Sequence, residues 1–184
     1  YKANRAEMPE DLRPQIPLIR DLVAALSIPI VELQGYEADD VMATLAREAA
    51  AQGLKAVIVS PDKDLLQLVN DDAGITVLNT KEGEVWYDRE GVKARMGVWP
   101  EQVVDFLTLL GDASDNVKGV PGIGEKGAAQ LLEQFGSLDA ILAAREQLKP
   151  RQRAGLDEAT APGTGWLSLT RRLVTVVTDL ALPL

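Results

Sequence analysis

GDASDNVKGVPGIGEK, from Gly111 to Lys126, joins an acidic turn to a glycine-rich loop that opens a helix. Asp112 and Asp115 are three residues apart, so one turn can direct both carboxylates at a hard divalent cation. The glycines that follow leave backbone N–H groups accessible at a helix N-terminus, where phosphate groups bind. Together the two halves indicate metal-assisted chemistry on a phosphodiester. Each half alone is equally consistent with ordinary turn and capping residues.

Composition limits the kinds of site that the chain can carry. Its 184 residues suffice for one domain with a core, or for a core with a small subdomain. It contains no Cys and no His, which excludes disulfides, Cys/His zinc sites, histidine bases and cysteine nucleophiles. No apolar run approaches the roughly 20 residues of a membrane span, and no signal peptide opens the sequence, so we expect a cytoplasmic protein without a membrane partner. The net charge of −9 is compatible with DNA binding if the acids cluster around cations.

Carboxylates recur where a predicted strand gives way to a predicted helix. We expect a strand over 29–35, followed by acids and then a helix, and a buried strand over 55–60, followed by the sequence PDKD and a second helical run. In an open α/β sheet, ligands bind beyond the carboxyl ends of the strands, so both acidic turns should face one crevice. With the acidic turn of the glycine-rich stretch, seven carboxylates are expected there: Glu37, Asp39, Asp40, Asp62, Asp64, Asp112 and Asp115.

Such a cluster is costly in the absence of cations. Two like charges about 4 Å apart repel by about 1 kcal/mol in water and by about 4 kcal/mol at an effective dielectric constant near 20. Divalent ions remove this repulsion, and carboxylate oxygens are the ligands that such ions prefer. The sequence therefore predicts a divalent metal site.

The remaining elements are expected to be structural, apart from two cations at the start of the chain. Lys2 and Arg5 share one face if that segment is helical, and they are either a phosphate clamp or two solvated charges. Residues 8–26 carry a helical stripe, although two prolines leave the start of the helix open. Residues 75–78 and 84–87 predict a hairpin, and residues 149–165 read as a basic loop followed by a loop rich in Gly, Pro and Thr.

The ordered set of motifs resembles a known family. YKANR, MPEDLR, EADD, DKD, GDASDN, GVPGIGEK and the closing SLTRRLVTVVTD are similar to the 5′-nuclease (5′-3′ exonuclease) domain of bacterial DNA polymerase I, a member of the flap endonuclease family. The resemblance covers nearly all of the chain, and the ordered set is specific where each motif alone is weak. Two departures are Pro61 and Gly127, where the family usually has glycine and threonine.

The resemblance implies an α/β fold with two parts. Residues 1–110 would be the C-terminal part of a PIN-like nuclease core, with a mostly parallel sheet, flanking helices and the base of a helical arch. Residues 111–184 would be a helix-three-turn-helix DNA-binding subdomain with the closing segment.

The resemblance also implies a catalytic set. The seven carboxylates would hold or orient two divalent ions, Mg²⁺ or Mn²⁺. Lys2 and Arg5 would contact the scissile phosphate from the base of the arch. The residues implied to be catalytic are Lys2, Arg5, Asp39, Asp62, Asp64 and Asp115.

A separate group of residues would bind the duplex. By resemblance, Gly122, Gly124 and Lys126 would grip DNA phosphates together with Lys2 and Arg5. A potassium ion would be held by the backbone carbonyls of the same loop, at Gly119, Val120 and Ile123.

The implied reaction is hydrolysis of a DNA phosphodiester near a 5′ flap during replication and repair, by a nucleoid-associated protein. In the family, two further aspartates precede YKANR, so we expect an N-terminal nuclease segment as a partner and a polymerase domain in the same parent chain. One alternative is a branched-DNA-binding module that lacks those ligands and does not cut. Another is an RNA-cutting relative with the same acidic core.

Overall fold

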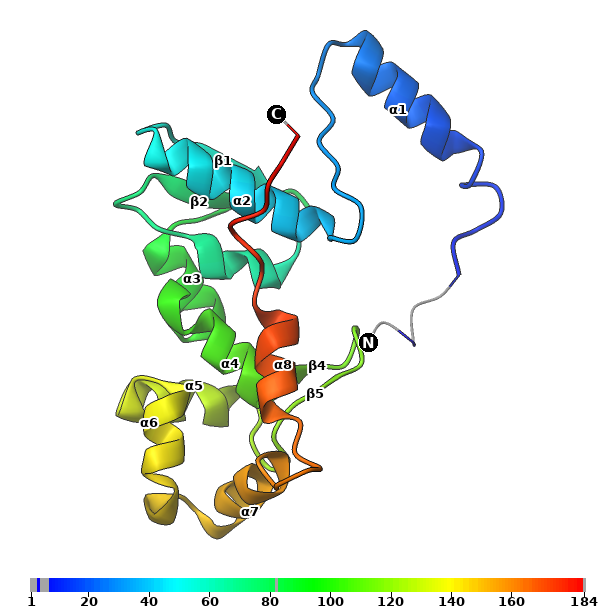
Figure 1. Ribbon diagram of the computed structural model, residues 1–184. Coiled ribbons are helices and arrows are strands. Elements are labelled where there is room, and N and C mark those ends of the chain that lie inside the picture. The colour runs from blue at the N-terminus through cyan, green and yellow to red at the C-terminus, as the bar shows by residue number, and fades with distance from the viewer. Residues whose placement is uncertain (1–2, 4–6, 82, 184) are drawn as a thin grey trace.

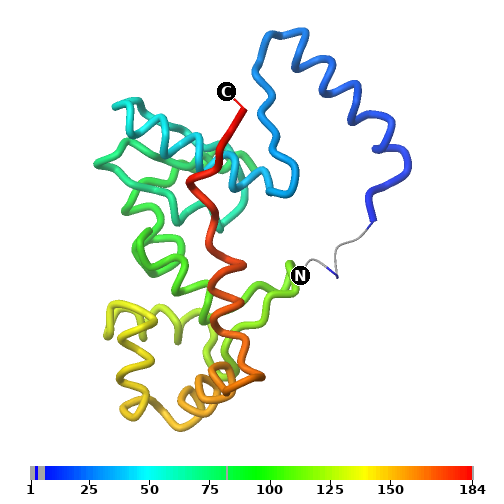
Figure 2. The backbone as a smooth tube through the Cα atoms, in the orientation of Figure 1, coloured from blue at the N-terminus to red at the C-terminus, as the bar shows by residue number. Residues whose placement is uncertain are grey.

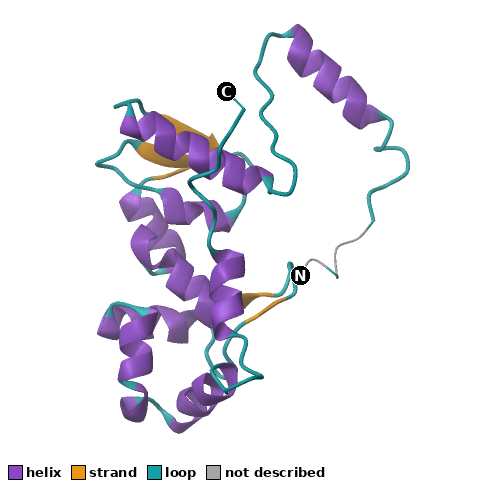
Figure 3. Cartoon of the chain, viewed as in Figure 1, coloured by secondary structure: helices purple, strands orange, loops and turns teal. Residues whose placement is uncertain are grey.

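The computed structural model describes residue 3, residues 7–81 and residues 83–183 (Figure 1). An α/β layer lies above a mainly helical part, and the first helix stands apart from both (Figure 1). Helices dominate, while strands occur in two separate places (Figure 3). No helix within the described ranges combines the length and the apolar content that a membrane crossing requires.

The α/β layer contains a three-stranded sheet in the order β1-β2-β3. β1 and β2 are parallel, and β3 pairs antiparallel with β2, as the predicted hairpin requires. The fold class is the one predicted, an α/β core with a helical subdomain. The three-stranded sheet has one parallel and one antiparallel pairing. The elements of this half are α1 (Gln15–Ala25), α2 (Ala38–Ala51), β1 (Ala56–Val59), η1 (Lys63–Leu68), β2 (Ile75–Asn79) and β3 (Val85–Tyr87).

The two faces of the sheet differ in burial. Ile58, Ile75 and Val77 are buried in the core, and α2 and η1 pack against β1 and β2 respectively. Val57 and Val59, which alternate with Ile58 along β1, are 49% and 56% exposed. Because successive side chains of a strand point to opposite faces, one face of β1 is covered and the other is open.

The second half is organised around α4, which contacts α5, α8 and η1. Val103, Phe106, Leu107 and Leu109 of this helix are at most 2% exposed, because the helix is surrounded on several sides. The elements here are α3 (Arg89–Met96), η2 (Pro100–Gln102), α4 (Val103–Leu110), β4 (Gly111–Asp112), β5 (Val117–Lys118), α5 (Glu125–Phe135), α6 (Leu138–Ala143), η3 (Arg145–Gln147), α7 (Pro150–Ala159) and α8 (Leu167–Val174).

After α8 the chain runs back to the α/β layer as an extended C-terminal strap, residues 175–183 (Figure 2). The Val176 N–H donates to Gln67 Oε1 at 3.1 Å, and the Leu180 N–H donates to Thr44 Oγ1 at 3.3 Å. The strap therefore fastens the last helix of the chain to α2 and η1.

The strand predicted over 29–35 is wrong. These residues have no regular secondary structure. Pro29 has no N–H to give to a ladder, and Ile30 is 43% exposed, so a strand here would gain neither pairing nor burial.

Two helices also differ from the expectation. Residues 150–159 form α7 instead of a loop, with Pro150 at the first helical position and Leu156 fully buried. The start of α1, left open by the sequence, lies at Gln15. Pro17 then falls in the first turn, where the N–H that proline lacks has no intrahelical partner.

Candidate active site

The structure gathers six of the seven predicted carboxylates around one pocket of about 180 Å³. The pocket lies where the carboxyl end of β1 and the N-terminus of α2 meet α8 and the C-terminal strap. Its other wall is formed by residues 172–177. The six carboxylates are Glu37, Asp39, Asp40, Asp62, Asp64 and Asp115.

The α2 side of the pocket is set by the way that helix begins. Glu37 is the N-cap residue, and its backbone N–H donates to Asp40 Oδ2 at 3.3 Å. Asp40 Oδ1 accepts a hydrogen bond from the Val177 N–H at 2.8 Å. Both oxygens of Asp40 therefore bind backbone groups, and this carboxylate ties the C-terminal strap to the helix.

Asp62 and Asp64 enter the pocket from the turn into η1. Asp62 Oδ1 accepts from the Asp64 N–H at 3.0 Å and so caps η1, while the Asp62 N–H donates to Ser60 Oγ at 3.1 Å. Asp64 Oδ1 is buried and has no hydrogen-bond partner. Burial, and next the charge of Asp62, raise the pKa of Asp64 to about 7. A buried carboxylate oxygen without a partner is costly unless a cation or a proton compensates it.

Asp112 is not among the residues that line the pocket. Its carboxylate pairs with Lys63 Nζ and also accepts hydrogen bonds from the Ser114 N–H, at 2.8 Å, and from the Ser114 hydroxyl. Burial lowers the pKa of Lys63, but the hydrogen bond and charge of Asp112 outweigh it and leave that pKa raised. Burial of Asp112 acts against its hydrogen bonds to Lys63 and Ser114, which leave its pKa lowered. The structure thus places a lysine as counter-ion inside the predicted cluster.

The donor set fits a hard divalent ion in chemistry. Every predicted ligand is a carboxylate, and one of them presents an unpaired buried oxygen. Among the described residues, no group of three or more carboxylates is close enough to hold an ion as it stands. The roles of the seven residues as metal ligands stay predictions.

The hairpin β4–β5 links this pocket to the glycine-rich loop. A Cβ on Gly119 would lie 2.1 Å from the Leu110 carbonyl oxygen, and a Cβ on Gly111 would lie 2.3 Å from the Gly119 nitrogen. Real Cβ atoms essentially never approach so closely, so both positions require glycine. The two ends of the hairpin are thereby packed backbone against backbone.

Two later helices brace the loop. A Cβ on Gly155 of α7 would lie 1.9 Å from the Pro121 carbonyl oxygen, so α7 rests directly on the loop backbone. Trp166 Nε1 donates to the Gly119 carbonyl at 3.1 Å, and Thr170 Oγ1 donates to the Lys118 carbonyl at 2.7 Å. The loop is held by contacts from segments far along the chain.

The predicted phosphate-binding groups lie at the open end of this braced loop. Gly124 is the N-cap of α5, and a Cβ there would meet nothing within 4 Å. Lys126 is exposed in the first turn of the same helix, and Gly122 has the positive φ of 81° that favours glycine. The α5 N-terminus is thus accessible to an anion.

The backbone carbonyls that are predicted to bind potassium accept different hydrogen bonds. The Gly119 carbonyl accepts from Trp166 Nε1, and the Val120 carbonyl accepts from the Ile123 N–H at 3.1 Å. Each carbonyl keeps a second lone pair, so the potassium site stays a prediction.

Sequence reasoning assigned no role to several residues that shape the site, and it also named two that the structure does not place. Lys63 was passed over although it stands between two aspartates, a position that signals an internal counter-ion. Arg172 and the C-terminal strap lie far from the other pocket residues in sequence, and no local pattern predicts their approach. Lys2 and Arg5 lie outside the described residues.

Comparison with protein families divides the chain into two matches. Residues 1–97 match the 5′-3′ exonuclease N-terminal resolvase-like domain, and residues 98–184 match the 5′-3′ exonuclease C-terminal SAM fold. The two family matches meet between residues 97 and 98, and the boundary after residue 110 stays a prediction. The family junction precedes α4, which packs on both halves.

Curated relatives match nearly the whole chain. DNA polymerase I of Chloroflexus aurantiacus is 45% identical over 188 residues, which cover 100% of this chain and 20% of that protein. DNA polymerase I of Caldicellulosiruptor bescii is 43% identical, over 99% of this chain and 21% of the relative. A 5′-3′ exonuclease of Aquifex aeolicus is 40% identical, over 100% of this chain and 60% of the relative. The chain thus spans about one fifth of these polymerases and three fifths of that exonuclease.

Solved structures share the fold. A T5 5′-exonuclease with bound divalent metal ions (zinc) has a TM-score of 0.74 at 23% identity, covering 94% of this chain and 63% of that one. The catalytic core of Rad2 in complex with DNA substrate has a TM-score of 0.56 at 20% identity, covering 94% and 59%.

Proposed function

The chain belongs to the 5′-3′ exonuclease family, and from this premise we propose that it hydrolyses DNA phosphodiesters at 5′ flaps with the help of divalent metal ions. The proposal includes the ions Mg²⁺ or Mn²⁺, two in the complete site, and a role in DNA replication and repair. The chain covers only about one fifth of its DNA polymerase I relatives, which supports a polymerase domain in the same parent chain. The proposal also includes an N-terminal nuclease segment and a place at the nucleoid.

One observation carries this proposal. The carboxylate pocket and the accessible N-terminus of α5 are joined by a hairpin whose ends pack backbone against backbone. A site for cations and a site for phosphate are therefore held at a fixed separation, as an enzyme that grips and cuts one phosphate backbone requires.

The proposed roles of the pocket carboxylates follow from the contacts that each of them makes. Asp64, with its unpaired buried oxygen, and Asp62 and Asp115 beside it are the proposed main metal ligands. Bound divalent ions would activate water and stabilise the leaving oxygen, so that this chemistry requires no histidine. Asp40 holds the C-terminal strap in place, and Glu37 and Asp39 bring further negative charge toward the ions.

The duplex is gripped on the other side of the hairpin. The N–H groups at the start of α5, where Gly124 leaves open space, are proposed to bind backbone phosphates together with the loop at Gly122. Lys126 adds a positive charge, and a potassium ion bound to the carbonyls of Gly119, Val120 and Ile123 would add another.

A cleavage time course with a labelled 5′-flap duplex in Mg²⁺ tests the proposal. We expect Asp64→Asn and Asp115→Asn to reduce cutting by at least a hundredfold while flap binding persists. The matched control is Asp72→Asn, which removes the same charge from an exposed position outside the pocket. Full cutting by Asp64→Asn would contradict the proposed site.

The binding-only alternative is kept because of a specific observation. No ready-made cage of three carboxylates exists among the described residues, and Asp112 is paired with Lys63. If the unmodified chain binds the flap duplex but does not cut it in either Mg²⁺ or Mn²⁺, this result would favour the binding-only alternative over the nuclease.

A further inference from the structure

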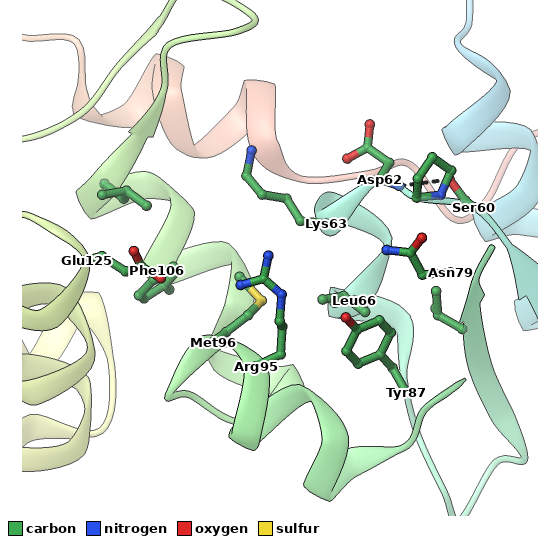
Figure 4. A pocket seen from close by; sticks show the side chains of 13 residues that line it. Ser60, Asp62, Lys63, Leu66, Asn79, Tyr87, Arg95, Met96, Phe106 and Glu125 are labelled. Carbon is green, nitrogen blue, oxygen red and sulfur yellow. Dashed lines mark hydrogen bonds between the residues drawn. The ribbon is translucent and has the colours of Figure 1, made fainter. Parts of the chain in front are cut away.

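A second pocket, of about 260 Å³, adjoins the carboxylate pocket (Figure 4). Asp62 lines both. The second pocket lies beyond the carboxyl ends of β1 and β2, and residues of α3 and α4 also line it. Ligands of open α/β sheets bind at this edge.

Three polar residues in its wall are more than nine-tenths buried: Ser60, Asn79 and Tyr87 are 8%, 7% and 6% exposed. Two of them already accept one hydrogen bond each: Ser60 Oγ accepts from the Asp62 N–H at 3.1 Å, and Asn79 Oδ1 accepts from the Lys81 N–H at 2.9 Å. Within the described part of the chain, no hydrogen bond uses the Ser60 hydroxyl proton, the Asn79 amide N–H₂ or the Tyr87 hydroxyl. The pocket therefore presents donors.

Arg95 of α3 supplies a positive charge to the same space. Figure 4 shows its guanidinium directed into the pocket that Tyr87 and Asn79 also line. Among the described residues, no hydrogen bond or ion pair holds this guanidinium, whereas Arg89 on the same helix is paired with Glu101 at 2.7 Å.

The other charged residues around the pocket are Asp62, Lys63 and Glu125. Lys63 is paired with Asp112, and Asp62 caps η1 with its carboxylate directed away from Arg95 (Figure 4). Glu125 lies at the rim, at the start of α5. Met96 and Phe106 add apolar wall next to the donors.

We propose that this pocket binds the 5′-phosphate and the nucleoside of a deoxynucleotide, either a free nucleoside monophosphate or the 5′ end of a strand. The convergent donors and Arg95 match the oxygens of a phosphate group, and the apolar wall matches a base or sugar. The volume lies just below the roughly 300–1,000 Å³ of typical ligand pockets, which suits one nucleotide. This assignment rests on the proposed nuclease function, because cutting next to Asp62 places a 5′-phosphate beside the pocket.

Calorimetric titration of the whole chain with dAMP in EDTA tests this proposal. EDTA removes metal-bridged phosphate binding at the carboxylates, so the result does not depend on whether the chain cuts DNA. We expect Arg95→Met to weaken dAMP binding at least tenfold and Tyr87→Phe to weaken it severalfold. Arg47→Met, at an exposed arginine of α2, is the matched control and should leave the affinity unchanged.

Further ligands identify which part of the nucleotide is recognised. Deoxyadenosine should bind at least tenfold more weakly than dAMP, and so should inorganic phosphate. A 5′-phosphorylated tetranucleotide that binds more tightly than dAMP would assign the pocket to strand ends, and the reverse order would assign it to the free product. The proposal is overturned if Arg95→Met binds dAMP like the wild type, or if either fragment binds as tightly as dAMP.

Discussion

Replacing Asp64 with asparagine should stabilise the metal-free protein at pH 8. The pKa of Asp64 stands at about 7 against 3.8 for a free aspartate, and burial is the main cause. An acid whose pKa is raised by folding costs no stability below pH 4. The cost grows as the pH rises from about 4 to about 7 and stays constant above that range.

The expected change in the free energy of unfolding follows from how far the pKa of Asp64 is raised. About three pKa units correspond to roughly 4 kcal/mol at pH 8, since one unit is about 1.4 kcal/mol. Asparagine removes the charge but leaves a buried amide to satisfy, at a cost of about 1–3 kcal/mol. We therefore expect a net gain of about 1–3 kcal/mol, which raises Tm by roughly 2–10 °C for a chain of this size.

Thermal unfolding in EDTA at pH 5 and pH 8 measures the effect. The wild type should lose stability between the two values, and Asp64→Asn should lose much less. Mn²⁺ at a hundredfold excess over its Kd should stabilise the wild type by about 2.7 kcal/mol and the variant far less. Asp72→Asn controls for the loss of one surface charge. A lower Tm for Asp64→Asn than for the wild type at pH 8 in EDTA would refute the assigned burial cost.

Three further predictions concern the glycine-rich loop. Gly124→Val should fold normally, because a Cβ there meets nothing within 4 Å. It should weaken flap binding at least tenfold, because the new side chain fills the approach to the α5 N-terminus, and it should leave Mn²⁺ binding, measured by calorimetry, unchanged. Lys126→Ala should lower the slope of log affinity against log salt by roughly one unit, measured by fluorescence anisotropy, and an unchanged slope would remove Lys126 from the phosphate contacts. Gly155→Ala should push α7 away from the Pro121 carbonyl, lower the free energy of unfolding in urea by about 1–3 kcal/mol and weaken flap binding. A variant as stable as the wild type would show that α7 does not brace the loop.

The sequence predicted the assembly of the carboxylates because a local rule governs it. Acids that follow a strand lie at the carboxyl edge of the sheet, and this holds for Asp62 and Asp64 after β1. Glu37 and Asp39 lie beside them although the strand predicted before these two acids is absent. The glycine-rich loop before α5 was predictable for the same reason, since turn and capping signals lie within a few residues of each other.

The sequence could not predict contacts between distant segments. No sequence pattern near Asp112 predicts its pairing with Lys63, and no pattern near Gly155 predicts that α7 packs on the loop backbone. The apolar run over 29–35 predicted a strand because periodicity does not report whether a pairing partner is present. The basic residues of 149–153 suggested a loop, although Pro150 was also a helix-start signal.

The hairpin β4–β5 also sets a length. Its ends, Gly111 and Gly119, are pressed so closely together that no side chain fits between them, and the separation between acidic turn and loop is fixed by the backbone alone. Under the proposed function, this hairpin sets the distance between the loop that binds the duplex and the point of cutting. Substitutions elsewhere would then change how fast the chain cuts, whereas the nucleotide at which it cuts would be inherited from the geometry of the hairpin.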